Sequence, residues 1–85
     1  MLICLQKVAP AQNQRRYYAL SVSPTLFGEW SLVREWGRLD QRGGTMKSAV
    51  FPTESDAEVA LRSVQRRKER RGYVSLGTQM ELPFR

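Results

Sequence analysis

The feature that most constrains the fold is one amphipathic helix that follows Pro52. Its apolar residues recur at spacings of three and four and so form one narrow stripe; they are Ala57, Ala60, Leu61 and Val64. A lone helix cannot bury such a stripe by itself, so it needs a second layer to pack against. We expect the helix to run from Glu54 to Arg71, with Thr53 as N-cap and Gly72 just past its end.

The residues before this helix alternate between apolar and polar side chains, which is the pattern of strands buried on one face. Four strands are expected, at residues 2–8, 17–22, 29–36 and 45–51. In the third, Trp30, Leu32, Arg34 and Trp36 share one face, and Gly37 is expected to end the strand. Residues 73–76 could add a short edge strand.

The connections carry polar residues, proline and glycine. We expect a loop at residues 10–16, a hairpin loop at 23–28 and a turn at 40–44. In the hairpin loop, Leu26 and Phe27 are expected to fold back over the core, with a partner-docking tip as the alternative.

These elements predict one α+β domain over residues 1–85, with a core at about 2–76 and a tail at 77–85. It is a two-layer domain, in which an antiparallel sheet of four to five strands carries one helix across one face. The 41% hydrophobic share is enough for one core in a chain of this length.

The chain is basic, with fourteen Lys and Arg against eight Asp and Glu, for a net charge of +6. Such a charge on a small domain favours polyanionic partners, and arginine, the commoner cation here, has a planar donor fork suited to phosphate. The alternative is that the charge serves only solubility.

The residue types argue against catalysis and metal binding. There is no histidine and a single cysteine, Cys4, so neither a zinc site built from Cys and His nor an internal disulfide is expected. No base is placed to activate a serine, and no glycine-rich phosphate loop occurs. We therefore expect no enzyme, no cofactor, no metal and no small-molecule substrate.

No apolar run approaches the about eighteen residues that a membrane span requires, and no leader pattern is present. The sequence predicts a cytoplasmic chain without membrane contact.

Three strings together resemble the WGR domain family: Tyr17 to Leu20, Leu26 to Leu39 (LFGEWSLVREWGRL), and the helix end from Lys68 to Tyr73. In DNA-dependent poly(ADP-ribose) polymerases, modules of this family bind DNA breaks. The chain looks like the small bacterial members. The resemblance implies that Trp36 packs on the sugar of a terminal nucleotide and that Arg38 lies at the strand end or its phosphate.

One position departs from the family pattern. Most members place glycine two residues after the arginine of the Trp36-Gly37-Arg38 triplet, whereas this chain has Asp40. A negative charge there disfavours phosphate, and we expect Asp40 to pair with Arg38 or Arg42.

The leading hypothesis is a non-catalytic module that binds nucleic acid, namely DNA ends or breaks. The expected binding residues are the triplet and nearby cations: Trp36, Gly37, Arg38, Arg34, Arg42, Lys47, Arg15 and Arg16. For Trp36 the alternative is a ring that only fills the core. For the cations it is a solvated sheet face with cross-strand pairs such as Glu35 with Lys47. Basic residues at 66–71 are interpreted as stabilising the helix dipole or keeping the chain soluble, with a role in binding as the alternative.

The rival hypothesis is a protein–protein interaction adaptor that docks a partner on the same face. A structural or regulatory subunit without such a ligand is the third interpretation.

Overall fold

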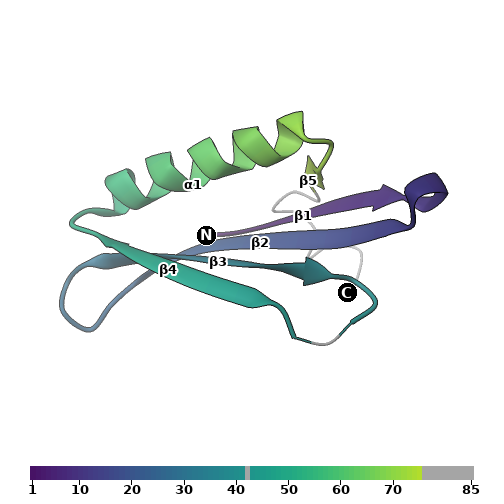
Figure 1. Cartoon of the computed structure of the whole chain (residues 1–85). Coiled ribbons are helices and arrows are strands. Elements are labelled where there is room, and N and C mark those ends of the chain that lie inside the picture. Colours follow the sequence, from purple (N-terminus) through teal and green to yellow (C-terminus); the bar gives the residue numbers. More distant parts are fainter. Residues whose placement is uncertain (42, 76–85) are drawn as a thin grey trace, which may run out of the picture.

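The computed structural model describes residues 1–41 and 43–75 and has two layers (Figure 1). One layer is an antiparallel sheet in the order β4-β3-β2-β1-β5, and the other is helix α1. The elements are β1 (Leu2–Ala9), the 3₁₀ helix η1 (Pro10–Gln12), β2 (Gln14–Pro24), β3 (Trp30–Arg38), β4 (Thr45–Phe51), α1 (Glu54–Arg70) and β5 (Val74–Ser75). The expected α+β class, with one helix across one face of the sheet, is confirmed.

The core lies between α1 and the sheet. Cross-strand pairing sets Tyr18 opposite Trp36 and Val22 opposite Leu32, so one face of the hairpin collects the large apolar side chains. The buried residues come from both layers: Ile3, Leu5, Tyr18, Leu20, Val22, Leu32, Ala57, Leu61 and Val64. Burying each large apolar side chain contributes about 1.5–3 kcal/mol. The predicted helix stripe and the predicted strand faces are therefore confirmed.

Both ends of α1 are capped by hydrogen bonds. The hydroxyl of Thr53 accepts a bond of 3.1 Å from the backbone N–H of Asp56. At the other end, the N–H of Tyr73 donates to the carbonyl of Lys68, and Gly72, at φ +99°, donates to the carbonyl of Glu69. These two bonds form a Schellman motif, which needs a left-handed residue such as glycine. The helix ends at Arg70, one residue before the expected end.

The hairpin strands are longer than expected. β2 begins at Gln14 because η1 and Asn13, at φ +54°, already complete the reversal from β1. Pairing of Tyr17 with Gly37 and of Arg16 with Arg38 carries β3 through the glycine. The predictions that the loop extends to Arg16 and that Gly37 ends the third strand are therefore wrong.

The hairpin loop between β2 and β3 presents its apolar tip to solvent. Leu26 and Phe27 are 98% and 86% exposed, so the expectation that they fold back over the core is wrong. The Thr25 hydroxyl accepts bonds of 3.2 Å from the backbone N–H groups of Phe27 and Glu29. These bonds close the loop locally, and the two apolar side chains stay outside it.

β5 pairs with β1 at the edge of the sheet and confirms the expected edge strand at residues 74–75. Leu76 and the predicted tail at 77–85 lie outside the described residues. Among the described residues, α1 is neither long nor apolar enough to cross a membrane.

Candidate functional site

An aromatic cluster lies at the edge of the core, where α1 ends. Trp36, on β3, stacks on Tyr18 of β2 with ring centroids 5.4 Å apart and an interplanar angle of 6°. Tyr73, the last residue of the Schellman motif, meets Tyr18 edge-on, with ring centroids 6.2 Å apart. Tyr18 is buried, whereas Trp36 is half-buried and packs against the core from its rim. Both interpretations of Trp36 are thus partly met, because the ring supports the core and also reaches solvent.

Steric crowding explains why glycine occupies the middle position of the triplet. A Cβ on Gly37 would lie 3.1 Å from the Tyr17 ring and 3.3 Å from the Gly43 carbonyl oxygen. A Cβ on Gly44 would lie only 2.5 Å from the carbonyl oxygen of Trp36. The loop between β3 and β4 can lie this close to the Trp36 backbone because Gly37 and Gly44 both lack a side chain.

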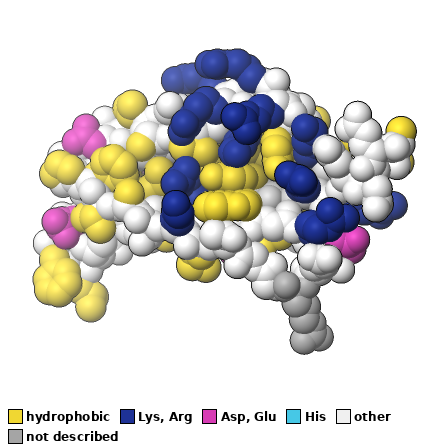
Figure 2. All heavy atoms as spheres, viewed as in Figure 1, with side chains coloured by type: hydrophobic (Ala, Val, Ile, Leu, Met, Phe, Trp, Pro, Cys, Tyr) yellow, Lys and Arg dark blue, Asp and Glu magenta, His cyan; other side chains and the backbone are white. Residues whose placement is uncertain are grey.

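Basic side chains lie over these rings. The Lys68 ammonium is 4.6 Å from the Tyr18 centroid and 5.8 Å from that of Tyr73. The Arg34 guanidinium is 5.8 Å from the Trp36 ring. Figure 2 shows this face of the molecule, on which Lys and Arg side chains gather around an apolar patch and the acidic side chains lie toward its ends. Cation–π contacts of this kind hold the charges close to the aromatic faces.

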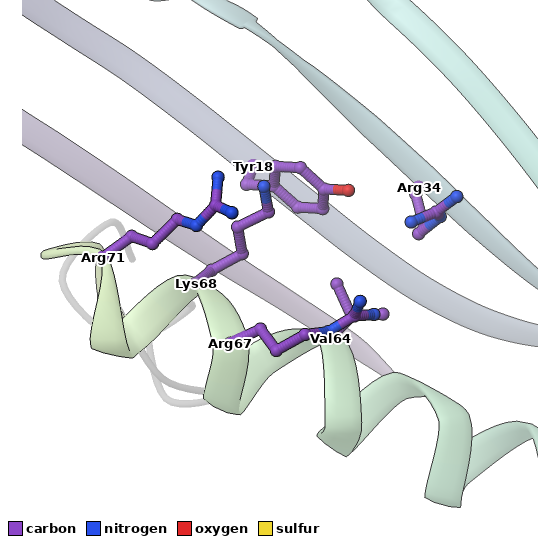
Figure 3. A pocket seen from close by; sticks show the side chains of 6 residues that line it. All are labelled: Tyr18, Arg34, Val64, Arg67, Lys68 and Arg71. Atoms are coloured by element: carbon purple, nitrogen blue, oxygen red, sulfur yellow. The ribbon is translucent and has the colours of Figure 1, made fainter.

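Two hollows open on this face. The first, of about 110 Å³, lies between α1 and the sheet (Figure 3) and is lined by Tyr18, Arg34, Val64, Arg67, Lys68 and Arg71. The second, of about 130 Å³, is lined by Arg16, Trp36, Gly37, Arg38 and Tyr73. Of the two stacked rings, Tyr18 lines the first hollow and Trp36 lines the second.

The positive charge of this face is mostly uncompensated. Within residues 1–41 and 43–75 the one salt bridge joins Arg38 Nε to Asp40 Oδ1 at 3.4 Å, which confirms the expected pairing of Asp40. Arg38 Nη2 also donates to the carbonyl of Asn13. The pKa of Lys68 is lowered from its ordinary value, first by burial and then by the positive charges of the arginines around it.

The structure separates the predicted binding residues. Five lie on the face that carries α1, by strand alternation and register: Arg16, Arg34, Trp36, Arg38 and Lys47. Arg15 alternates to the opposite face of the sheet, and Arg42 lies outside the described residues. The expected pair of Glu35 with Lys47 is wrong, because Lys47 is opposite Arg34 and Glu35 accepts a 3.2 Å bond from the Tyr17 hydroxyl.

Tyr18, Tyr73 and the inward cations of α1, namely Arg67, Lys68 and Arg71, belong to this site although the sequence pattern does not predict it. For the three cations the pattern favours a structural or solubilising role, whereas the structure shows that they line the first hollow. One feature of the sequence points to this site. A glycine that ends a helix, here Gly72, turns the next residue, Tyr73, back toward the last helical turn, which carries Lys68.

Comparisons with known proteins identify the family of the chain. The WGR domain model matches residues 1–80. An uncharacterized protein of Sinorhizobium fredii is 39% identical over 69 residues, which cover 81% of this chain and 33% of the relative. The chain thus spans about a third of that relative's length. No solved structure matches the chain. The family match covers nearly all of the chain, and the chain belongs to the WGR domain family.

Proposed function

We propose that the chain is a non-catalytic module that binds nucleic acid and contacts DNA ends or breaks through Trp36 and Arg38. The observation that carries this proposal is a half-exposed Trp36 ring in one hollow with Arg16 and Arg38. The resemblance to the polymerase modules supplies the same two roles, a tryptophan against a terminal sugar and an arginine near its phosphate.

The chemistry of this hollow suits the end of a strand. An aromatic face that stacks on a nucleotide contributes about 1–3 kcal/mol and discriminates little between bases. Arg16 and Arg38 are paired across β2 and β3 and can donate to phosphate oxygens next to that ring. Such contacts give salt-dependent binding without base readout.

Asp40 does not block this use of Arg38. The Arg38 side chain is 34% exposed and that of Asp40 is 53% exposed, so their salt bridge is a surface pair. Surface pairs stabilise by about 0–1 kcal/mol. A phosphate can therefore displace the carboxylate at small cost.

The test is a titration of a fluorescent duplex with 5′-phosphate ends, at two salt concentrations, with wild type, Trp36→Ala and Arg38→Ala. Arg66→Ala is the matched control, because it also removes one arginine but is exposed and lines neither hollow. Both site variants are expected to bind at least tenfold more weakly than the control. A circular duplex without ends is expected to compete poorly. Equal binding by all four proteins would contradict the proposal.

A protein partner on the same face is the second candidate. It is favoured by the composition of the patch, because Trp, Tyr and Arg dominate the energy of protein–protein contacts. In this case the chain would capture a protein partner in a pull-down. The capture would survive nuclease treatment and high salt, and it would be lost in Trp36→Ala.

A further inference from the structure

Four cations from two different elements meet in the hollow between α1 and the sheet. Arg67, Lys68 and Arg71 come from the last turns of the helix, and Arg34 comes from β3 on the other side of the hollow (Figure 3). We propose that this hollow is a phosphate-binding subsite, distinct from the contact at Trp36 and Arg38. On DNA it would take a backbone phosphate of the strand held at Trp36, and this second part rests on the proposed function.

The four cations lack counter-charges. In the part of the chain that the structure describes, none of them forms a salt bridge. Glu69, on the same turn of the helix, accepts a bond of 3.3 Å from the Gln65 amide instead. Like charges that share a hollow repel one another, and a bound oxyanion would convert this repulsion into attraction. The pKa of Lys68 is lowered, first by burial and then by the positive charges of Arg71, Arg67 and Arg34, and these later causes agree with mutual repulsion.

The helix dipole does not account for this arrangement. Any basic side chain in the last turn stabilises the dipole, whichever way it faces. Arg66 and Arg70 satisfy that role and do not line the hollow. Arg34 is not on the helix at all, yet it lines the same hollow as the three helix cations.

The hollow also has the dimensions and the floor of an anion site. Its volume of about 110 Å³ exceeds the share of liquid volume of one water, about 30 Å³, several-fold, which leaves room for a phosphate group. Tyr18 and Val64 form an apolar floor. An apolar floor reduces screening of the charges above it, and the guanidinium groups offer bidentate donors to a tetrahedral oxyanion.

One strand can reach both subsites. Lys68 lies 4.6 Å from the Tyr18 centroid, and the Trp36 centroid lies 5.4 Å from Tyr18. The ammonium is therefore within about 10 Å of the Trp36 ring, the rise of about three nucleotides. A strand with its terminal sugar on Trp36 would place one of its next phosphates at the hollow.

The first experiment uses inorganic phosphate as the probe. Thermal unfolding is measured in sodium phosphate and in sodium chloride of equal ionic strength. The double variant Arg67→Gln/Arg71→Gln, the inward pair, is compared with the control pair Arg66→Gln/Arg70→Gln, which removes the same charge from residues that do not line the hollow. Phosphate is expected to raise the Tm of wild type and of the control pair by several degrees. In the inward pair, most of this increase in Tm is expected to be lost.

The second experiment uses the labelled duplex and measures how the binding constant falls with salt. One lost phosphate contact reduces the slope of log K against log salt by about 0.7–0.9. The inward pair is expected to show this reduction beyond that of the control pair.

The outcomes are separable. Loss of the phosphate effect in the inward pair, with an unchanged salt slope, would support a subsite for free phosphate and overturn its role on DNA. Identical behaviour of the two double variants in both experiments would overturn the subsite. If Trp36→Ala binds DNA like wild type, the proposed function fails, and the phosphate experiment still decides the subsite.

Discussion

Trp36 and Tyr18 stack within 6° of parallel, so a buried ring supports a half-exposed one. Tyr18 is 4% exposed and belongs to the core, while Trp36 reaches the surface from the neighbouring strand. A ligand that packs on Trp36 therefore meets a ring whose orientation is already set by the core, which reduces the entropy lost on binding.

The stack predicts energetic coupling between the two rings. A double-mutant cycle with Tyr18→Leu and Trp36→Leu is expected to give a coupling of about 0.5–1.5 kcal/mol in the free energy of unfolding, measured by urea denaturation. Tyr18→Leu should also weaken DNA binding, although the tyrosine is buried. Val22→Ala destabilises the same core away from the rings, so it should leave DNA binding unchanged at a temperature where both variants are folded. Additive losses of stability would contradict the coupling.

The salt bridge between Arg38 and Asp40 predicts a variant with stronger binding. Asp40→Asn removes a negative charge next to the proposed phosphate contact and releases Arg38. We expect DNA affinity to rise several-fold at low salt and to approach that of wild type at high salt, because exposed charges are screened. Stability should change by less than about 1 kcal/mol. The measurement is a fluorescence titration at two salt concentrations, and weaker binding by Asp40→Asn would show that the carboxylate positions Arg38 usefully.

The close approach of Gly44 to the Trp36 carbonyl predicts a steric defect. Gly44→Ala puts a Cβ 2.5 Å from that oxygen and should lower the free energy of unfolding by about 1–3 kcal/mol. It should also shift the indole fluorescence, because the displaced backbone belongs to Trp36. The control is Gly28→Ala, at φ +80° with nothing within 4 Å, which costs only the left-handed strain of about 1–2 kcal/mol. Unchanged fluorescence in Gly44→Ala would argue against the contact.

Local patterns were enough to predict the layers of this fold. The spacing of Ala57, Leu61 and Val64 identifies a helix that must be covered, and strand alternation identifies the face that covers it. Register and loop geometry depend on tertiary contacts, so the sequence predicts a strand end at Gly37, whereas in the structure Gly37 pairs with Tyr17 and β3 continues to Arg38. Leu26 and Phe27 were expected inside because they are apolar, but local bonds to Thr25 decide where they point.

The candidate site was predictable in part for the same reason. Trp36 and Arg38 are adjacent to one glycine in the sequence, so the motif identifies them directly. The inward cations of α1 become part of the site only through the crossing of the helix over β3, which no short-range pattern contains. Arg66 and Arg67 are neighbouring arginines that composition does not distinguish, yet only Arg67 lines the hollow.

The exposed hairpin tip predicts a tolerant position. Leu26→Ser/Phe27→Ser removes two side chains that are almost fully exposed, so the free energy of unfolding should change by no more than about 0.5 kcal/mol. DNA binding should be unchanged, because neither residue lines a hollow. Urea denaturation and the duplex titration check both statements. Leu61→Ala, a fully buried comparison, should cost about 2–5 kcal/mol. A loss of similar size at the tip would mean that Leu26 and Phe27 do pack on the core.

The lowered pKa of Lys68 predicts a pH dependence of stability with a definite sign. Because this pKa is below its ordinary value of 10.5 in the folded protein, the unfolded chain binds more protons between the two values. The charged ammonium therefore destabilises the fold at neutral pH, and this penalty disappears as the pH rises from the folded pKa to 10.5. Tyr17 acts in the opposite sense, because burial and its bond to Glu35 raise its pKa above 10.0. Its contribution to the stability of the fold therefore falls as the pH rises beyond that value.

A measurement at Lys68 itself separates these two effects. The pKa can be followed by the ¹³Cε shift of labelled lysine in a Tyr17→Phe background, with Lys68→Arg to assign the signal. Arg67→Gln and Arg71→Gln are each expected to raise this pKa, because each removes a neighbouring positive charge. Inorganic phosphate should raise it as well in the parent protein. A Lys68 pKa at or above 10.5 without phosphate, unchanged by either substitution, would mean that the cations do not share the hollow.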